Sequence, residues 1–317
     1  MNKKVLVTGG AGYIGSACVQ ALIAAGHQAV VLDNFSTGQR DKVSAGAEVI
    51  TGDLTDRVCL QKVFAEHHFD AVMHFAAKKA VGESEADPAQ YFYNNVVGSL
   101  NLLEAMSAAS VPQLVFSSTA AVYASSPLGD SLTEASPLSP MSVYGLTKLM
   151  TEEAIQTYAR LGKIRQFTTL RYFNVAGDAG LSYREDNAQN VFPILAKSVE
   201  EQLPFLVFGN DYTTKDGTGV RDYIHLADLA EAHLLALESE KSDTYNLGTG
   251  TGYSVLDLVN TFSLVTGEVV ITHEAPRRAG DPDTVVADAT KAKNELGWQP
   301  KKTLTEMVED TWQVYQK

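Results

Sequence analysis

Cysteine and long apolar runs are both scarce in this chain of 317 residues. Its two cysteines, Cys18 and Cys59, form no C-x-x-C pair or other metal-binding spacing, so no metal site is expected. A disulfide between them stays open, but free thiols in a reducing cytoplasm are favoured. No stretch approaches the ~20 apolar residues of a membrane span, and the apolar run after Lys4 stops at Thr8, short of the ~7–15 residues of a secretory signal. We therefore expect a cytoplasmic protein with no membrane partner.

Positive charge is also in short supply. The chain has 25 lysines and arginines against 38 acidic residues, a formal net charge of −13. A partner bound mainly through phosphate neutralisation, such as nucleic acid, is therefore not expected. An anionic small ligand stays possible, because one or two well-placed arginines suffice to bind it. The balance of 45% hydrophobic and 20% charged residues is that of an ordinary globular protein, and the length allows one large domain or two smaller ones.

The first half of the chain alternates short β-branched runs with longer helical patterns. The runs are nearly all apolar, which is typical of strands whose two faces are both covered by helices. Such repetition predicts an α/β fold with a Rossmann-type doubly wound parallel sheet. The predicted strands are 4–8, 29–33, 48–51, 71–75, 114–117 and 167–171, and the predicted helices are 13–25, 59–67, 91–108 and 144–161.

This rhythm breaks after Asn174. Residues 177–190 are rich in glycine, aspartate and asparagine and predict a loop, and helical patterns follow at 192–202, 229–239 and 255–266. We predict a first domain over residues 1–175, to which the chain returns around 222–247. A smaller C-terminal domain takes up most of residues 176–317.

A glycine-rich turn follows the first predicted strand and opens the first predicted helix. It fits G-x-G-x-x-G from Gly10 and equally G-x-x-G-x-x-G from Gly9. Glycine is needed because the backbone must turn sharply and approach a pyrophosphate, which the helix N-terminus then binds through its amides and dipole. A glycine turn alone is weak evidence. The flanking strand and helix, with an acidic residue at the end of the second strand, complete a dinucleotide-binding fingerprint.

Asp33 is that acidic residue. Its carboxylate can accept both ribose hydroxyls and would repel a 2′-phosphate, so NAD is expected rather than NADP. The alternative is that Asp33 only caps the turn at Asn34. Asp53 lies at the same edge of the predicted sheet, where it could reach the adenine or cap the helix that starts near Thr55.

Tyr144 and Lys148 lie four residues apart on a predicted helix and therefore on one face, about 5–6 Å apart at Cβ. A fixed cation beside the phenol is expected to lower the pKa of Tyr144 from ~10, so that it can take a proton from an alcohol while hydride leaves the carbon. Hydroxyls at the end of a nearby strand, Ser117 to Thr119, could share this proton network. Taken alone, such a pair more often marks a solvated helix face.

Longer segments, from Val5 to about Gln313, resemble the extended short-chain dehydrogenase/reductase family, and within it the subgroup that acts on nucleotide sugars. In the first half the resemblance is carried by V-L-V-T-G-G (5–10), L-D-N (32–34), H-F-A-A-K-K-A-V-G-E-S (74–84) and R-Y-F-N (171–174). In the second half it is carried by F-G-N-D-Y (208–212), D-G-T-G-V-R-D-Y-I-H (216–225), Y-N-L-G (245–248) and A-P-R-R-A-G-D (275–281). The second-half segments are the most specific, because they belong to the nucleotide-sugar subgroup.

The resemblance implies a role for each matching residue. Tyr144 is the acid/base, Lys148 tunes its pKa and contacts the ribose, and Thr119 bridges the phenol to sugar O4 in place of the more common serine. The implied NAD contacts are Gly9, Gly12, Tyr13, Ile14, Gly15, Asp33, Asn34, Asp53, Leu54, Phe75, Lys79, Asn94, Tyr144, Lys148 and Tyr172. The implied UDP-sugar contacts are Thr119, Tyr144, Asn174, Asn190, Phe208, Arg221, Arg278, Asp281 and Val285. Two arginines are well suited to bind a pyrophosphate. By its sequence alone, Phe208 would be predicted as a core residue. His225 would be predicted to form a structural hydrogen bond.

The implied reaction is inversion at sugar C4, which interconverts UDP-glucose and UDP-galactose through a 4-keto sugar and regenerates NAD in each cycle. UDP-N-acetyl sugars are further candidate substrates. One alternative is a dehydratase, but the Asp-Glu pair expected after the catalytic threonine is Ala120-Ala121 here. The other is a non-catalytic NAD-sensing regulator, which has no need of Tyr144 and Lys148 together.

Two further expectations concern substrate range and assembly. Val285 matches a family position beside sugar C2, where a tyrosine admits only glucose and galactose and a small residue also admits an N-acetyl group. Valine is smaller than tyrosine, but its β-branched side chain is stiff and cannot rotate fully away from the sugar. The alternative is that Val285 belongs to a buried strand, 284–287, and does not contact the sugar. Helices 91–108 and 144–161 are apolar on more than one face, which predicts a homodimer unless other parts of the chain cover them.

Overall fold

The computed structural model describes residues 2–124, 131–185, 189–278 and 280–316. Part of the loop predicted at 177–190, residues 186–188, lies outside this range. By the density of its internal contacts the chain divides into two compact units. Unit 1 comprises Met1–Ala124, Leu138–Arg171 and Ala230–Tyr245, and unit 2 comprises Ser125–Pro137, Tyr172–Leu229 and Asn246–Lys317.

A seven-stranded sheet forms the centre of unit 1, in the order β10-β6-β5-β4-β1-β2-β3. Pairs β1–β2, β2–β3, β1–β4 and β4–β5 are parallel, and Val5 lies opposite both Ala29 and Ala71. The strand order reverses between β1 and β4, and open sheets of this kind bind ligands at the carboxyl ends of the strands beside that point. The strands are β1 (Lys4–Thr8), β2 (Gln28–Asp33), β3 (Glu48–Thr51), β4 (Ala71–His74), β5 (Gln113–Thr119), β6 (Gln166–Tyr172) and β10 (Asp243–Leu247).

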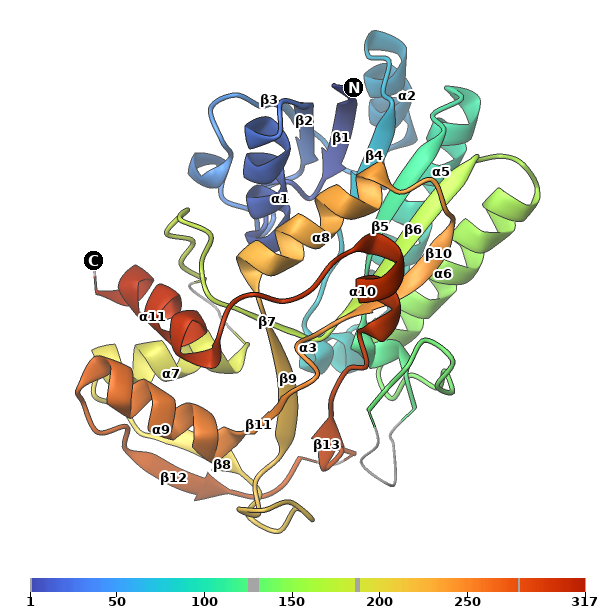
Figure 1. Ribbon diagram of the computed structural model, residues 1–317. Helices are drawn as coiled ribbons and strands as arrows, with labels where there is room; N and C mark the ends of the chain where they lie inside the picture. Colours follow the sequence, from blue (N-terminus) through green and yellow to red (C-terminus); the bar gives the residue numbers. More distant parts are fainter. Residues whose placement is uncertain (1, 125–130, 186–188, 279, 317) are drawn as a thin grey trace. The chain divides into compact units, whose positions relative to one another are not determined.

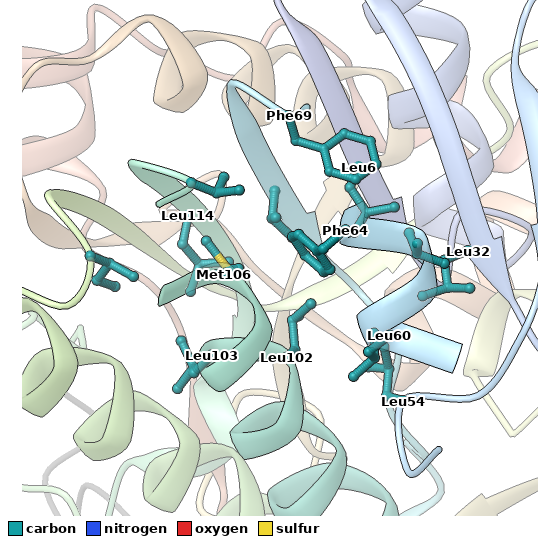
Figure 2. Packing of buried hydrophobic residues seen from close by; sticks show 14 of the residues in the cluster. Leu6, Leu32, Leu54, Leu60, Phe64, Phe69, Leu102, Leu103, Met106 and Leu114 are labelled. Carbon is teal, nitrogen blue, oxygen red and sulfur yellow. The ribbon is translucent and has the colours of Figure 1, made fainter. Parts of the chain in front are cut away.

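Helices cover both faces of this sheet (Figure 1). Helices α1 (Tyr13–Ala24) and α8 (Leu226–Glu238) lie on one face, and α2 (Arg57–Glu66), α5 (Gly98–Ala108) and α6 (Val143–Arg160) lie on the other. On the second face, Leu6, Leu32 and Leu114 from the strands pack with Phe64 of α2 and Leu102 of α5 (Figure 2). Burial of each such side chain contributes roughly 1.5–3 kcal/mol to the stability of the fold. Because helices cover both faces of the sheet, most positions of these strands are buried, and the strands are therefore largely apolar runs in the sequence.

Between β4 and α5 the chain forms α3 (Val81–Ala86), α4 (Pro88–Tyr91) and a π-helical turn, η2 (Phe92–Val97). The periodicity predicts one helix over 91–108, and it misses this π turn because an inserted residue changes the phase without changing the composition. The Tyr91 hydroxyl donates to the Ala80 carbonyl at 2.8 Å and holds α3 against α4.

Unit 2 contains smaller sheets. Strand β9 (Val220–His225) pairs with β11 (Gly252–Ser254), β13 (Thr284–Val285) and β7 (Asn174–Ala176), and β8 (Phe205–Phe208) pairs with β12 (Thr272–Ala275). Helices α7 (Val191–Glu200), α9 (Val255–Thr266) and α11 (Leu304–Tyr315) share a core with these strands. Phe192 lies at its centre, with ring centroids 5.2 Å from Tyr223 and 5.7 Å from Phe262. The remaining helix, α10, covers Thr290–Leu296.

The predicted α/β fold class with a doubly wound sheet is confirmed. Each of the six predicted strands and seven predicted helices has a counterpart in the structure, with ends that differ by a few residues. Helices α3, α10 and α11 and strand β10 have no counterpart among the predictions, nor do the strands of unit 2 other than β13, which falls in the strand 284–287 given as the alternative for Val285. Among the described helices, none is both long and apolar enough to cross a membrane.

Candidate active site

The glycine turn between β1 and α1 is packed so tightly that larger residues do not fit. Gly9 has a φ of +71°, and a Cβ there would lie 2.6 Å from the Ala76 nitrogen. A Cβ on Gly15 would lie 2.2 Å from the Gly9 carbonyl oxygen. Helix α1 begins at Tyr13 with Gly12 as its N-cap, so Tyr13, Ile14 and Gly15 form its first turn. A helix that begins directly behind such a turn is a binding site for an anion.

Asp33 joins this turn to the end of β2. Its Oδ2 accepts from the Ala11 amide at 3.0 Å, and its Oδ1 accepts from the Phe35 amide at 2.8 Å. The carboxylate therefore shapes the turn that follows it, as the alternative interpretation expects. Each oxygen keeps a second lone pair, so these bonds do not prevent it from accepting ribose hydroxyls.

Both carboxylate oxygens of Asp53 accept hydrogen bonds from neighbouring residues. Its Oδ2 accepts from the Asn34 side chain at 2.7 Å, and its Oδ1 accepts from the Thr55 amide and hydroxyl at 2.8 and 2.7 Å. Burial alone would raise the pKa of Asp53, but these hydrogen bonds outweigh it and the pKa is lowered. Helix α2 is capped by Asp56, so Asp53 fixes Asn34 at the sheet edge instead of capping that helix. Neighbouring Leu54 packs in the core of unit 1.

The segment after β4 returns toward β1. The amide of Phe75 donates to the Thr8 carbonyl at 2.9 Å, and its half-buried ring lies 4.8 Å from the His233 ring. Lys79 is exposed, and Asn94 is half-buried in the π turn. The neighbouring Asn95 accepts from the Lys78 amide at 2.8 Å and donates to its carbonyl at 3.0 Å, so it clamps the backbone beside Lys79.

Tyr144 lies in the first turn of α6, and three amides of that turn are capped by side chains. Ser142 caps Gly145, Ser84 accepts from the Tyr144 amide at 3.2 Å, and Glu85 accepts from the Val143 amide at 2.8 Å. Two of the caps thus come from α3, nearly sixty residues earlier in the chain. They fix the start of the helix and with it the backbone of Tyr144.

Gly145 lets this turn approach the end of β5. A Cβ at Gly145 would lie 2.3 Å from the Ala121 carbonyl oxygen in the short 3₁₀ turn η3 (Ala120–Val122), directly after Thr119. The phenol of Tyr144 lies close enough to the Thr119 side chain for Thr119 to lower the pKa of the phenol. One turn further along α6, the Lys148 ammonium donates to the Ser117 carbonyl at 2.8 Å. The structure therefore brings together the three predicted catalytic residues.

The electrostatics of this group differ from the sequence-based expectation. Burial raises the pKa of Tyr144 to about 12, and the nearby Thr119 side chain offsets only part of the rise. Burial lowers the pKa of Lys148 to about 7, against the opposing charge of Glu152. The expectation of a lowered pKa for Tyr144 is therefore wrong: the pKa is raised, because both groups are enclosed and enclosure disfavours both charges.

Unit 2 carries a second polar cluster. The Arg221 guanidinium donates to Asp281 at 2.6 Å, and the Tyr212 hydroxyl donates to the other oxygen of Asp281 at 2.7 Å. The guanidinium of Arg278 lies 4.2 Å from the centroid of the Phe208 ring, and Phe208 is only half-buried. The structure therefore places four predicted UDP-sugar residues in two contacting pairs on unit 2.

The other predicted residues of unit 2 lie in strands and at a helix start. Asn174 donates from its side chain to the Asp222 carbonyl at 3.1 Å, and Asn190 is the exposed N-cap of α7. Tyr172 is half-buried at the end of β6. Val285 is half-buried in β13, opposite Arg221 of β9. Val285 is thus a strand residue, as the alternative of a buried strand expects, but its side chain is not fully buried.

Several residues of these clusters are not predicted from the sequence. Arg277 stacks 3.9 Å from the centroid of the Tyr212 ring and pairs with Asp283. The caps Ser84 and Glu85 and the clamp Asn95 lie in or near quoted segments, but no local pattern indicates what they bind. His225 does match expectation: it hydrogen-bonds Asp310 at 3.0 Å. Among the described residues, no group of three or more His, Cys, Asp or Glu is arranged to hold a metal ion.

Known proteins with similar sequences point to one family. Residues 5–248 match the NAD dependent epimerase/dehydratase family. The chain is 47% identical over 315 residues to a UDP-glucose 4-epimerase of Corynebacterium glutamicum, with 98% of this chain and 94% of the relative covered. It is 46% identical over 324 residues to a UDP-glucose 4-epimerase of Bacillus subtilis, with 97% and 95% covered.

A solved structure agrees with these sequence matches. It is a UDP-glucose-4-epimerase from Stenotrophomonas maltophila with bound NAD and formylated UDP-arabinopyranose. It superposes with a TM-score of 0.94 at 41% identity, and 99% of this chain and 98% of that one are covered.

Proposed function

The chain belongs to the NAD dependent epimerase/dehydratase family, and from this premise we propose that it interconverts UDP-glucose and UDP-galactose by inverting C4 of the sugar. The observation that carries the proposal is that Tyr144 and Lys148, one helical turn apart on α6, both lie against the strand end that carries Thr119. A proton acceptor beside a second hydroxyl and a cation is what oxidation of a sugar alcohol requires.

The residues of unit 1 fit NAD. Pyrophosphate would lie on the first turn of α1, where Gly9, Gly12 and Gly15 leave no Cβ in the way. Asp33 would accept the adenosine ribose hydroxyls, which favours NAD over NADP. The other NAD contacts that we assign are Tyr13, Ile14, Asn34, Asp53, Leu54, Phe75, Lys79, Asn94, Tyr144, Lys148 and Tyr172. When bound, NAD would supply the acceptor for the hydride that leaves C4 and is later returned to it.

The chain's own groups handle the proton and the orientation. Tyr144 takes the proton of the 4-hydroxyl and later gives it back, and the Thr119 hydroxyl bridges the phenol and sugar O4. Because burial raises the pKa of Tyr144 to about 12, ionisation of the phenol has to be assisted, and the positive charge of Lys148 favours it. The 4-keto sugar turns over while its UDP stays held, so hydrogen returns to the opposite face.

The UDP group is assigned to unit 2. Arg221 and Arg278 are the charged donors for the pyrophosphate, Asp281 is an acceptor for ribose hydroxyls, and the half-buried Phe208 borders the uracil. Asn174 and Asn190 complete the set. Unit 1 is then the NAD-binding domain and unit 2 the UDP-sugar-binding domain. Both described cysteines are free thiols, which supports a reducing, cytoplasmic location.

Val285 is assigned as the residue that limits the C2 substituent of the sugar. Its half-buried place in β13, in register with Arg221, puts it beside a residue that we assign to the pyrophosphate. We expect UDP-glucose and UDP-galactose to be the best pair, with measurable activity on UDP-N-acetylglucosamine. A difference of one methylene in a pocket is worth only ~1–3 kcal/mol, so preference is expected instead of exclusion.

A homodimer is proposed from exposed apolar side chains on unit 1. Tyr93, Val97 and Leu100 lie on one face of the continuous helix formed by η2 and α5, and they are 58%, 37% and 36% exposed. On the adjacent α6, Leu146 and Met150 are each 38% exposed. A monomeric mass in solution at micromolar concentration would contradict the proposal.

The dehydratase alternative is disfavoured by η3, where Ala120 and Ala121 after Thr119 offer neither acid nor base. Incubation of the protein with NAD and UDP-galactose alone tests the proposal. We expect UDP-glucose to form without net release of NADH. Tyr144→Phe should lower the rate by ~10²–10⁴-fold, because it removes the proton acceptor, whereas Tyr158→Phe on the same helix serves as the matched control. No UDP-glucose from the wild type would overturn the proposed function.

A further inference from the structure

A nearly fully buried ion pair lies behind the catalytic strand end in unit 1. Arg171 of β6 donates from Nε to both oxygens of Glu152 on α6, at 3.0 and 3.2 Å, and a second guanidinium nitrogen also donates to Glu152. Their side chains are only 4% and 1% exposed. A buried ion pair is often no more stabilising than apolar residues of the same volume. Stability alone is therefore a weak explanation for it.

The pair holds the chain on both sides of Thr119. Ser118, the residue before Thr119, donates its hydroxyl to Glu152. Tyr123, four residues after Thr119, accepts from Arg171 at 3.0 Å, and the guanidinium also lies 5.0 Å from the Tyr123 ring centroid. The strand end and the η3 turn are thus tied to helix α6 through two charged side chains.

The same carboxylate acts on Lys148. Glu152 follows Lys148 by one helical turn, and its charge raises the pKa of Lys148 against burial, which lowers it to about 7. His74 of β4 also faces Lys148, and its pKa is lowered to about 3 by burial and by the Lys148 charge, so it is neutral. The charge of Arg171 is compensated by Glu152 itself. Glu152 therefore supports the ammonium form of Lys148.

We propose that Glu152 is a positioning residue for the proposed epimerisation: held by Arg171, it fixes the strand end Ser117–Thr119 against α6. This inference rests on the proposed function, because it assigns a task toward the same reacting group. Beyond the proposed function, it assigns to Glu152 and Arg171 the task of holding Thr119 in place relative to Tyr144.

The decisive variant is Glu152→Gln with Arg171→Met, which removes both charges at similar volume and is expected to fold. We expect a melting temperature near or above that of the wild type, but a kcat at pH 8 that is at least ~10-fold lower. We also expect the alkaline limb of the pH–kcat profile to move to lower pH, because Lys148 has lost its anion. Glu153→Gln, an exposed neighbour on α6, should leave melting temperature, kcat and profile unchanged.

A second variant covers the case in which the double variant does not fold. Ser118→Ala removes only the link from the strand end to Glu152, so we expect a melting temperature close to wild type and a several-fold lower kcat. A wild-type kcat in Ser118→Ala would overturn the proposal, as would a double variant with wild-type kcat and pH profile. An inactive wild type would instead overturn the proposed function and this inference together.

Discussion

Gly145→Ala is the most direct perturbation of the approach between α6 and the η3 turn. The added Cβ would lie 2.3 Å from the Ala121 carbonyl oxygen and 3.0 Å from the Pro140 Cβ. An ordinary carbon–oxygen contact is about 3.3 Å, so the first turn of α6 must withdraw by roughly 1 Å. Tyr144 moves with it, away from Thr119, and a displacement of ~1 Å from reacting geometry can lower a rate by ~10²-fold.

Measuring both the melting temperature and kcat of Gly145→Ala separates a displaced Tyr144 from a general loss of stability. Overpacking costs about 1–3 kcal/mol, and the better helix propensity of alanine returns roughly 1 kcal/mol, so the melting temperature should fall by only a few degrees. The assay is kcat for conversion of UDP-galactose to UDP-glucose with NAD saturating. Gly82→Ala on α3 is the matched control, because its Cβ meets nothing within 4 Å. A Gly145→Ala enzyme with kcat within twofold of wild type would refute the argument.

Three further predictions address cofactor, substrate range and pH. Asp33→Ala should weaken the preference for NAD over NADP, measured as the ratio of their dissociation constants, because the repelling carboxylate is gone; an unchanged ratio would place discrimination elsewhere. Val285→Tyr should abolish activity on UDP-N-acetylglucosamine while keeping that on UDP-galactose, and equal losses on both would count against a gate. Burial lowers the pKa of His74 to about 3. Below pH ~6.5 the imidazole is therefore protonated in the unfolded chain but stays neutral in the folded protein. His74 alone should therefore lower the free energy of unfolding by ~1.4 kcal/mol per pH unit as pH drops from about 6.5 toward 3, so chemical denaturation of His74→Gln should show a shallower slope than the wild type.

The sequence predicts best what depends on local pattern. The strands of unit 1 are apolar because both faces of the sheet are covered, and the glycine turn and the Tyr144–Lys148 pair follow from backbone geometry and helical spacing. Helices α10 and α11 were missed, as were strands such as β7 and β11, which have only three residues each. A strand that short has no periodicity to detect.

Contacts between distant polar side chains are what the sequence does not reveal. The cap from Ser84 to Tyr144 spans 60 residues, and the pairing of Glu152 with Arg171 joins a helix to a strand. Each is made of residue types that are common on surfaces, so only the fold shows that they are buried and paired. The pKa of Tyr144 was missed for the same reason, since burial of the phenol outweighs the cation that the spacing places nearby.

The central claim is that hydrogen leaves C4 and returns to the same carbon while Tyr144 handles the proton. The most direct measurement uses UDP-galactose deuterated at C4, with the NAD-loaded enzyme and no other redox substrate. The proposed function predicts UDP-glucose that retains the deuterium at C4, with no NADH accumulating in solution. Loss of the label to solvent, a dehydrated keto sugar, or NADH released in proportion to product would contradict it.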